Sequence, residues 1–490
     1  IQIQHLPRVA ISDIIQIHDF LHFGNRFRHH HDKQNCQTSD HTEILSFHFS
    51  FVILFPPSLC HILKPMAGKH QLTRRHIDEV MGDRNVDELR NQLTPNLVDL
   101  PITLPVSAKT TRDRVDKIWE RIEGPPHLKS ALLDNTRDDD LAAYSGNIEN
   151  LIGSLQVPIG IAGPLRVNGL FAKGDYHIPM ATTEAALVAS YHRGISLITE
   201  SGGCSAMLVN ESLTRSPSFA FSDMATAGEF VLWAMAEIAS FRKIVTTTTQ
   251  HGELVDIGTT LEGNHVYLNF EFHTADASGQ NMITIATQAI CDFIVGNSPV
   301  TPKQAYVEAN LSGDKKASAR AFTTARGKKV SAEVFIPEEL VEKRLHCSVE
   351  NMCDYWRTSA IGGVLSGSIG IQGHFANGLT ALYLATGQDV ACVAESAVGV
   401  TRFEKTDGGD LYASVTLPAI MVGTVGGGTG LPTQNACLEL MGLVGPEKSR
   451  ALGEVVAGLI LGGELSIIGA LAAGHFTRAH KNLARGKSDK

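Results

Sequence analysis

Two adjacent lysines follow an aspartate in a short turn at residues 310–316, which read Asn-Leu-Ser-Gly-Asp-Lys-Lys. Turn-forming residues after an apolar run predict an irregular loop, and such a loop can direct a lysine at a ligand. A pair of lysines alone is more often a solvated surface pair. The chain also carries separate glycine-rich, glutamate-bearing and histidine-bearing segments. These segments favour a site that is assembled from distant parts of the chain around the lysines.

A glutamate lies in residues 180–190, which read MATTEAALVAS. A capping threonine followed by alanine and leucine predicts the start of a helix, with Glu184 in its first turn. The helix dipole alone explains a glutamate at such a place. A role in catalysis requires a neighbour that raises the pKa of Glu184, because the dipole and a nearby lysine both lower it. The candidate for this second carboxylate is Asp389, which follows the glycine-rich residues 361–373 and a predicted helix.

Two segments have the composition of phosphate-binding turns. The first, residues 276–282, reads DASGQNM and precedes a long apolar helix whose first backbone N–H groups can receive a phosphate. The second, residues 423–430, reads GTVGGGTG and resembles the glycine run of tubulin-like GTPases, but Leu431 and Pro432 break that pattern. No G-x-G-x-x-G motif lies between a strand and a helix, so a nucleotide has to bind differently than in a Rossmann fold.

A predicted small-residue helix over residues 464–483 carries His475 and His480. The two histidines lie on different faces because they are five positions apart, which excludes the i, i+4 zinc pair of H-E-x-x-H. His480 lies in a charged terminal segment, where it can swing as an acid. Residues 29–31 are three histidines that could bind a metal, but we expect them to belong to an unstructured leader. We therefore predict no metal site.

Length and composition restrict the class of protein. A chain of 490 residues is long enough for two or three domains with sizeable cores. The net charge is −9 without any long charged run, so no nucleic-acid partner is indicated and an anionic ligand must meet locally placed cations. The eight cysteines show no CxxC pair or zinc-type spacing. This pattern is typical of reduced thiols, and we expect a cytoplasmic protein.

Residues 1–65 differ from the rest of the chain and are expected to form a disordered leader. They hold nine of the 21 histidines, and their most apolar run, residues 49–55, is far shorter than the ~20 residues that span a bilayer. No membrane span is therefore expected. Met66 is a possible natural start of the protein, a hypothesis that intact-mass measurement of the native protein would refute by detecting residues before it.

The remaining chain divides into three predicted parts. Residues 66–145 are helical in pattern, and an amphipathic helix with Val115, Ile118 and Ile122 ends before Gly124. Residues 217–307 alternate between helical and strand-like patterns and are predicted to form an inserted α+β domain. Residues 146–216 and 308–490 then form one large domain around the insert.

Seven motifs, in the same order along the chain, resemble those of class I 3-hydroxy-3-methylglutaryl-coenzyme A (HMG-CoA) reductases. They are residues 149–164, 180–190, 276–282, 314–316, 387–389, 423–429 and 464–480. The resemblance extends from about Met66 to the C-terminus, and the membrane-anchor region of the family has no counterpart. It implies an α+β fold with a large CoA-binding domain and a small inserted, ferredoxin-like NAD(P)-binding domain. It also implies a homodimer or homotetramer with shared active sites.

The resemblance further implies an activity and a set of site residues. The family reduces the HMG-CoA thioester to mevalonate by two NADPH-dependent hydride transfers and releases CoA. Its catalytic positions fall on Glu184, Lys315, Asp389 and His480. Its substrate-binding positions fall on Arg215, Lys316, Asn377, Arg357, Ser190, Arg193 and Arg344, the last three of which would face CoA. Its cofactor-binding positions fall on Thr249, Gln250, Asp276, Ala277, Ser278, Gly279, Gln280, Asn281 and Met282.

Several residues depart from the pattern of the family. Arg357 stands where a substrate lysine is common, and Glu308 stands where a substrate-binding serine is common. Ala185 replaces the glycine after the catalytic glutamate. Residues 278–280 replace Met-Gly-Met, and residues 390–393 lack the familiar Gln-Asn after the catalytic aspartate. All four catalytic positions are intact, which favours an active enzyme.

The cofactor position also departs from the family. Gln250 stands where NADPH-dependent members place an arginine against the 2′-phosphate, so NADH is a possible cofactor beside NADPH. His251 or Arg242 would restore the preference for NADPH if the fold brings either to the phosphate. Two alternatives to the reductase stay open: an NAD-dependent enzyme that oxidises mevalonate, and a catalytically silent paralogue that only binds CoA esters or partners.

Overall fold

The computed structural model describes residues 74–474, except residues 76, 80, 96, 97, 99–103, 105, 123 and 134–137. The predictions for residues 1–65, His475 and His480 therefore lie outside the described residues. By its internal contacts the chain divides into two units, Ile1–Pro101 and Ile102–Lys490. In the first unit, helix α3 (Val86–Leu93) begins with a capping box formed by Asn85 and Glu88.

The second unit begins with three short helices, α4 (Arg112–Trp119), α5 (His127–Leu133) and α6 (Asp138–Ala143). They enclose a small core that contains Val115, Leu133 and Leu141. The indole Nε1 of Trp119 donates to the carbonyl oxygen of Ile152 at 2.8 Å. The amphipathic helix predicted from the apolar spacing is therefore present, but it ends at Trp119, before Ile122.

A mixed sheet forms the framework of the second unit, and its strands run in the order β7-β4-β6-β3-β8-β11-β10-β9. Strand β1 pairs with β2 in antiparallel fashion and with β3 in parallel fashion, while β5 pairs with β6. The mixture of helices with a largely antiparallel sheet confirms the predicted α+β class. The strands outside the insert are β1 (Ile159–Gly169), β2 (Lys173–Ala181), β3 (Cys204–Arg215), β8 (Gly327–Ile336), β9 (Gly370–Ile371), β10 (Gly399–Lys405) and β11 (Leu411–Ile420).

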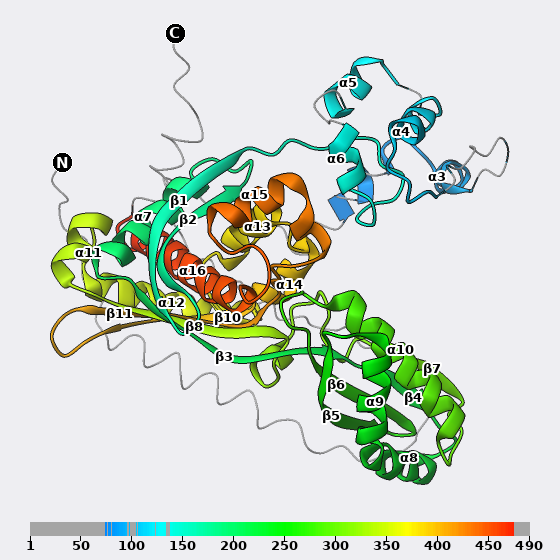
Figure 1. Cartoon of the computed structure of the whole chain (residues 1–490). Helices are drawn as coiled ribbons and strands as arrows, with labels where there is room; N and C mark the ends of the chain where they lie inside the picture. Colours follow the sequence, from blue (N-terminus) through cyan, green and yellow to red (C-terminus); the bar gives the residue numbers. More distant parts are fainter. Residues whose placement is uncertain are drawn as a thin grey trace, which may run out of the picture. The chain divides into compact units, whose positions relative to one another are not determined.

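Helix α16 (Ser449–Ala472) lies at the centre of this part of the molecule, against the sheet and beside α7 (Leu187–Glu200) (Figure 1). It is long and apolar enough to cross a membrane, but 83% of its apolar window is buried inside the protein, as in the core helix of a globular fold. A Cβ added to Gly194 would overlap the backbone of Gly462, so glycines allow the two helices to touch. The predicted start of this helix, Glu464, was wrong. Apart from Arg450 and Glu454, residues 449–463 are small or apolar on every face, and a helix that is buried nearly all round shows no amphipathic period.

Other short elements connect the framework. Helix α13 (Phe375–Thr386) crosses near β2, and Gly387 ends it with a φ of 69°. The remaining elements are η1 (Ala319–Phe322), α11 (Glu338–Leu345), α12 (Val349–Ser366), η2 (Val390–Cys392), α14 (Val393–Ser396), η3 (Gly427–Gly430) and α15 (Pro432–Leu440).

The region predicted as an insert forms a group of helices against strands (Figure 1). Its buried aromatic residues include Phe219, Phe230, Phe241 and Phe270. The last residues of β3 pair with β6, with Arg215 opposite Phe270, so the sheet continues from the large part into the insert. The elements are β4 (Ser218–Ala220), α8 (Met224–Ala236), α9 (Ile238–Thr248), β5 (Glu253–Glu262), β6 (His265–His273), α10 (Gln280–Asn297) and β7 (Gln304–Tyr306). The domain boundaries themselves stay predictions.

Candidate active site

Residues 310–316 (the lysine turn) have the irregular backbone that their composition predicts. Asn310, Gly313 and Lys315 have φ values of 63°, 75° and 55°. A left-handed conformation costs a residue with a Cβ ~1–2 kcal/mol, so the fold holds Lys315 in this state against a local preference. The result is an ion pair, with Lys315 Nζ 2.7 Å from Asp389 Oδ2. The turn therefore directs one lysine at the candidate second carboxylate.

The hydrogen bond to Asp389 raises the pKa of Lys315, and partial burial opposes this shift only in part. Lys315 therefore stays protonated to a higher pH than a free lysine. Both side chains are about 40% exposed, so solvent screens the pair and its contribution to stability is small.

We expect Asp389→Asn to move the alkaline limb of the pH–rate profile to lower pH. The substitution removes the charge that raises the pKa of Lys315 most and leaves the burial that lowers it. A lysine with a lower pKa loses its proton earlier as the pH rises. The measurement is kcat against pH for wild type and variant, and an unshifted alkaline limb would show that Lys315 does not set it.

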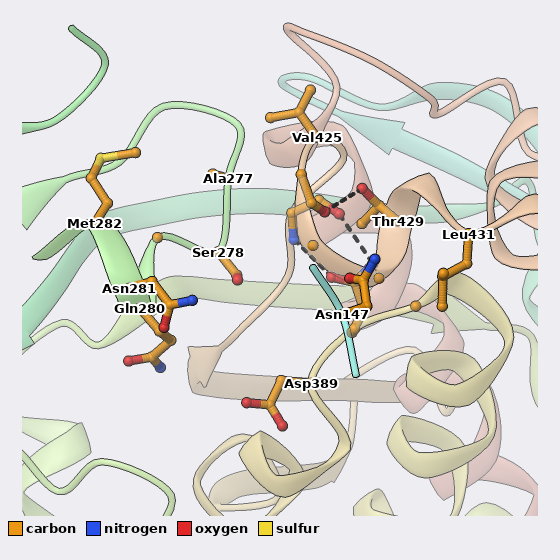
Figure 2. Close-up of a pocket in the computed structure, with 17 residues that line it drawn as sticks. Asn147, Ala277, Ser278, Gln280, Asn281, Met282, Asp389, Val425, Thr429 and Leu431 are labelled. Carbon is orange, nitrogen blue, oxygen red and sulfur yellow. Dashed lines mark hydrogen bonds between the residues drawn. The ribbon is translucent and has the colours of Figure 1, made fainter. Parts of the chain in front are cut away.

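Asp389 lies at one end of a cavity of about 480 Å³. Its carboxylate also accepts the backbone N–H of Ala391 at 3.0 Å, which fixes the start of η2. In Figure 2, Ser278, Gln280 and Asn281 lie on one side of this cavity and Val425, Thr429 and Leu431 on the other. The loop predicted to receive a phosphate therefore faces the glycine-rich segment 423–430, for which that role was not predicted, across one space.

The predicted cofactor loop lines this cavity except for its first residue. Ala277, Ser278, Gly279, Gln280, Asn281 and Met282 are all lining residues. Asp276 instead accepts the backbone N–H groups of Glu447 at 2.8 Å and Ser449 at 3.1 Å, at the start of α16. Burial opposes ionisation of Asp276, but these hydrogen bonds hold its pKa below the usual range. The aspartate thus attaches the loop to the core helix.

The turn that carries Gln250 lies beside the same loop. A Cβ added to Gly252 would lie 2.7 Å from the sulfur of Met282, and the side chain of Gln250 is exposed. Thr249 Oγ1 accepts the backbone N–H of His251 at 3.1 Å and holds the turn. Arg242 donates to the carbonyl oxygens of Leu254 and Val255, at 3.0 and 2.6 Å. The guanidinium of Arg242 is therefore hydrogen-bonded to the backbone of β5.

Glu184 lines a second cavity, of about 500 Å³, together with Ser190, Arg193, His374 and Asn377. Its Oε2 accepts the side-chain N–H of Asn377 at 3.0 Å. The prediction that Glu184 lies in the first turn of a helix was wrong, since α7 begins at Leu187.

The cause is local. Thr182 Oγ1 accepts the backbone N–H of Glu184 at 3.0 Å, which forms a turn instead of a helix cap. Ala186 follows with a φ of 69° and redirects the chain before α7. Glu184 therefore projects from a turn, and the helix dipole does not explain its presence.

The predicted CoA-facing residues do not all lie at the second cavity. Arg193 donates to the carbonyl oxygen of Ser466 at 2.7 Å, and burial lowers its pKa. Ser190 Oγ lies 2.9 Å from the hydroxyl of Ser466. By contrast, Arg344 forms an ion pair with Glu200 and lines neither of the two cavities described. Arg357 is likewise outside both, in an ion pair with Asp354 on the exposed face of α12.

Glu464 is a supporting residue for which the sequence predicted no role. It is completely buried in α16, and its carboxylate accepts the N–H groups of Gly373 at 2.7 Å and His374 at 2.8 Å and the hydroxyl of Thr401 at 2.8 Å. It thereby fixes the turn before α13, which carries Asn377. The available signal was a glutamate with apolar or small residues on both sides, because such a charge is buried only when it is hydrogen-bonded.

One chain brings four of the predicted site residues together in two pairs. Lys315 contacts Asp389, and Glu184 contacts Asn377, but no hydrogen bond or ion pair among the described residues joins the two pairs. Each pair lines or borders a different cavity. Among the described residues of one chain, Asp389 and Glu184 are therefore not joined by a direct contact of either kind.

Comparisons with known proteins agree on one family. The family model described as hydroxymethylglutaryl-coenzyme A reductase matches residues 113–485. The 3-hydroxy-3-methylglutaryl-coenzyme A reductase of Methanocaldococcus jannaschii is 42% identical over 352 residues, which cover 71% of this chain and 87% of the relative. That of Pyrococcus horikoshii is 44% identical over 347 residues, which cover 69% and 84%.

A solved structure shares the fold. The class II 3-hydroxy-3-methylglutaryl-CoA reductase of Streptococcus pneumoniae, bound to NADPH, aligns with a TM-score of 0.56 at 17% identity and covers 74% of this chain and 96% of its own. At this identity the likeness concerns the fold alone. The family model and the archaeal relatives decide the assignment, and the chain belongs to the hydroxymethylglutaryl-coenzyme A reductase family.

Proposed function

We propose that the protein reduces HMG-CoA to mevalonate and CoA in two hydride transfers, with NADPH as the preferred donor. Its family makes it an oxidoreductase of the mevalonate pathway that acts on this CoA ester; the cofactor and the direction are our proposal. The observation that carries it is the Lys315–Asp389 pair, 2.7 Å apart, at the cavity lined by residues 277–282. A cation thus borders the space that fits a nucleotide cofactor.

The residues present fit a nicotinamide dinucleotide. The start of α10 presents backbone N–H groups behind Gly279, and the facing glycine-rich segment 423–430 leaves room for a phosphate chain. The bound cofactor would supply the hydride. Lys315 would stabilise the negative charge that develops on the substrate oxygen at each transfer, and Asp389 would orient the lysine.

Proton transfer is assigned to two other groups. Glu184, oriented by Asn377, would donate a proton to the substrate oxygen, and His480, outside the described residues, would protonate the CoA thiolate. Arg215 and Lys316 would hold the free carboxylate of the substrate. Ser190 and Arg193, which line the second cavity, would face CoA.

We further propose that the active site is shared between chains of a homodimer or homotetramer. The separation of Glu184 from the Lys315–Asp389 pair supports this arrangement, because all three groups are needed at one substrate. Six described cysteines are free and buried, which suits a cytoplasmic enzyme.

The test is a spectrophotometric assay of HMG-CoA with NADPH and with NADH, and of mevalonate and CoA with the oxidised cofactors. Faster reduction than oxidation at equal saturation supports the proposal. Faster NAD-dependent oxidation of mevalonate would favour the oxidising form. Absence of turnover in all four assays, with CoA esters still bound, would identify a silent paralogue.

We expect Gln250→Arg to increase the preference for NADPH over NADH. An arginine adds a charge-assisted, bidentate bond to a 2′-phosphate that a neutral amide lacks, and hydrogen bonds to charged groups contribute ~1.5–3 kcal/mol. The measurement is kcat/KM for both cofactors. Gln304→Arg, which adds the same charge at exposed β7, is the control and should leave the ratio unchanged. A strong wild-type preference that Gln250→Arg does not increase would place the selecting cation elsewhere.

A further inference from the structure

Arg215 is almost completely buried at the end of β3, and internal acceptors already occupy its guanidinium. Its Nη1 donates to Asp314 Oδ2 at 3.0 Å and to Glu308 Oε2 at 3.3 Å, and its Nη2 donates to Gln280 Oε1 at 3.1 Å. Nε has no partner among the described residues. Both hydrogens of Nη1 are thus occupied, so a carboxylate of a substrate that binds through Nη1 has to replace Asp314 or Glu308.

The charge of Arg215 is also balanced before any ligand arrives. Arg326, which is buried nearby, pairs with Asp314 and with Glu395. The cluster thus contains two guanidinium groups and three carboxyl groups, Glu308 being the third. Burial raises the pKa of Glu395, and the ion pair with Arg326 opposes this shift. Even so, Glu308 and Asp314 suffice to neutralise the two arginines, and the cluster offers no excess positive charge.

Of the two carboxylates that accept from Arg215, Glu308 is held less firmly. Asp314 is bound by two arginines, which keep its pKa below the usual range although burial opposes its ionisation. Glu308 has the longer bond to Arg215 and one more donor, the backbone N–H of Ser216 at 3.2 Å. Its Oε1 is buried without a partner among the described residues. An unsatisfied buried oxygen costs free energy, so exchange of Glu308 for another carboxylate costs less than exchange of Asp314.

We propose that Glu308 competes with the terminal carboxylate of the substrate for Arg215 and thereby sets the affinity of the site for ligands with such a group. The inference rests on the proposed function, in which Arg215 and Lys316 hold that carboxylate. Lys316 supplies the neighbouring cation, since its exposed Nζ donates to the backbone oxygen of Asp314 at 2.9 Å. Glu308 therefore acts as an internal substitute for the substrate carboxylate and keeps the buried arginine neutralised in the free protein.

The first test measures binding without turnover, with free 3-hydroxy-3-methylglutarate as the probe and calorimetry as the readout. Glu308→Gln keeps the shape of the side chain and removes its charge, so we expect the Kd to fall about tenfold, as for one charge-assisted hydrogen bond. The dimethyl ester of the probe, which has no carboxylate, should gain no more than twofold. Glu333→Gln neutralises a half-buried carboxylate that accepts from Tyr412, away from both cavities, and should change neither Kd.

The second test measures kinetics. With HMG-CoA, Glu308→Gln should lower KM by a similar factor and change kcat less, because the bond is made in the ground state and the transition state alike. An unchanged or weaker Kd for the diacid in Glu308→Gln would overturn the inference and leave the proposed function intact. Tighter binding of the diacid in a protein that reduces no HMG-CoA would instead overturn the proposed function and keep the inference. If loss of cooperative unfolding shows that Glu308→Gln does not fold, Glu308→Ser supplies the same readouts.

Discussion

Lys315→Ala is expected to lower kcat with HMG-CoA by two to three orders of magnitude, because loss of one preorganised stabiliser of an oxyanion costs ~3 kcal/mol or more. The ammonium group borders the cofactor cavity and is directed there by a backbone that its residue type disfavours. The lysine charge matters most when the substrate oxygen becomes negative, so kcat should fall more than substrate binding weakens. The measurement is steady-state kinetics with HMG-CoA and NADPH.

Two controls separate catalysis from folding. Lys343→Ala removes an exposed lysine on α11 and should leave kcat unchanged. The Lys315–Asp389 pair is about 40% exposed, so its loss should hardly change the thermal unfolding midpoint of Lys315→Ala. Near-normal turnover in Lys315→Ala, with the fold intact, would remove the lysine from the mechanism.

Features that depend on neighbouring residues were predictable from the sequence. The residues around Lys315 form a turn because Asn, Ser and Gly tolerate or favour its irregular backbone. Gly387 ends α13 in the left-handed conformation, which places Asp389 directly after a helix as expected. The alternating residues 266–272 form the core of β6. In each case a short pattern determines the local conformation.

Features that depend on tertiary packing were not predictable in the same way. The hydroxyl oxygen of Thr182 could accept a hydrogen bond either as a helix cap or within a turn. Only the folded chain shows that it accepts the backbone N–H of Glu184 and forms a turn. The start of α16 left no periodic signal because the helix is buried on all sides. The binding of Asp276 to the N-terminus of α16 joins residues that are far apart in sequence. Such long-range hydrogen bonds leave no local pattern.

The separate positions of Glu184 and Lys315 in one chain bear on the shared active site that the resemblance implies. The resemblance implies that both residues act on one substrate, whereas the described residues place them at separate cavities. Symmetric oligomers form closed, self-complementary interfaces, and such an interface can bring the Glu184 cavity of one chain to the Lys315 cavity of its partner. This arrangement predicts that two inactive variants complement each other.

Glu184→Gln and Lys315→Ala, each nearly inactive alone, should regain activity when the two chains are co-expressed. A dimer with one chain of each kind has one site with both substitutions and one with neither. Random pairing makes half of the dimers mixed, and one of the two sites in each mixed dimer is intact. We therefore expect about a quarter of the wild-type activity per site, averaged over all dimers. Differently tagged chains and tandem purification enrich the mixed dimer, whose activity should approach about half of wild type.

Co-expression of Lys315→Ala with Asp389→Asn is the matched control, because these residues contact each other within one chain and serve one site. If the mixed Glu184→Gln and Lys315→Ala dimer is purified and stays inactive, Glu184 and Lys315 of the same chain must form the site, and α7 would have to move toward the lysine turn when substrate binds.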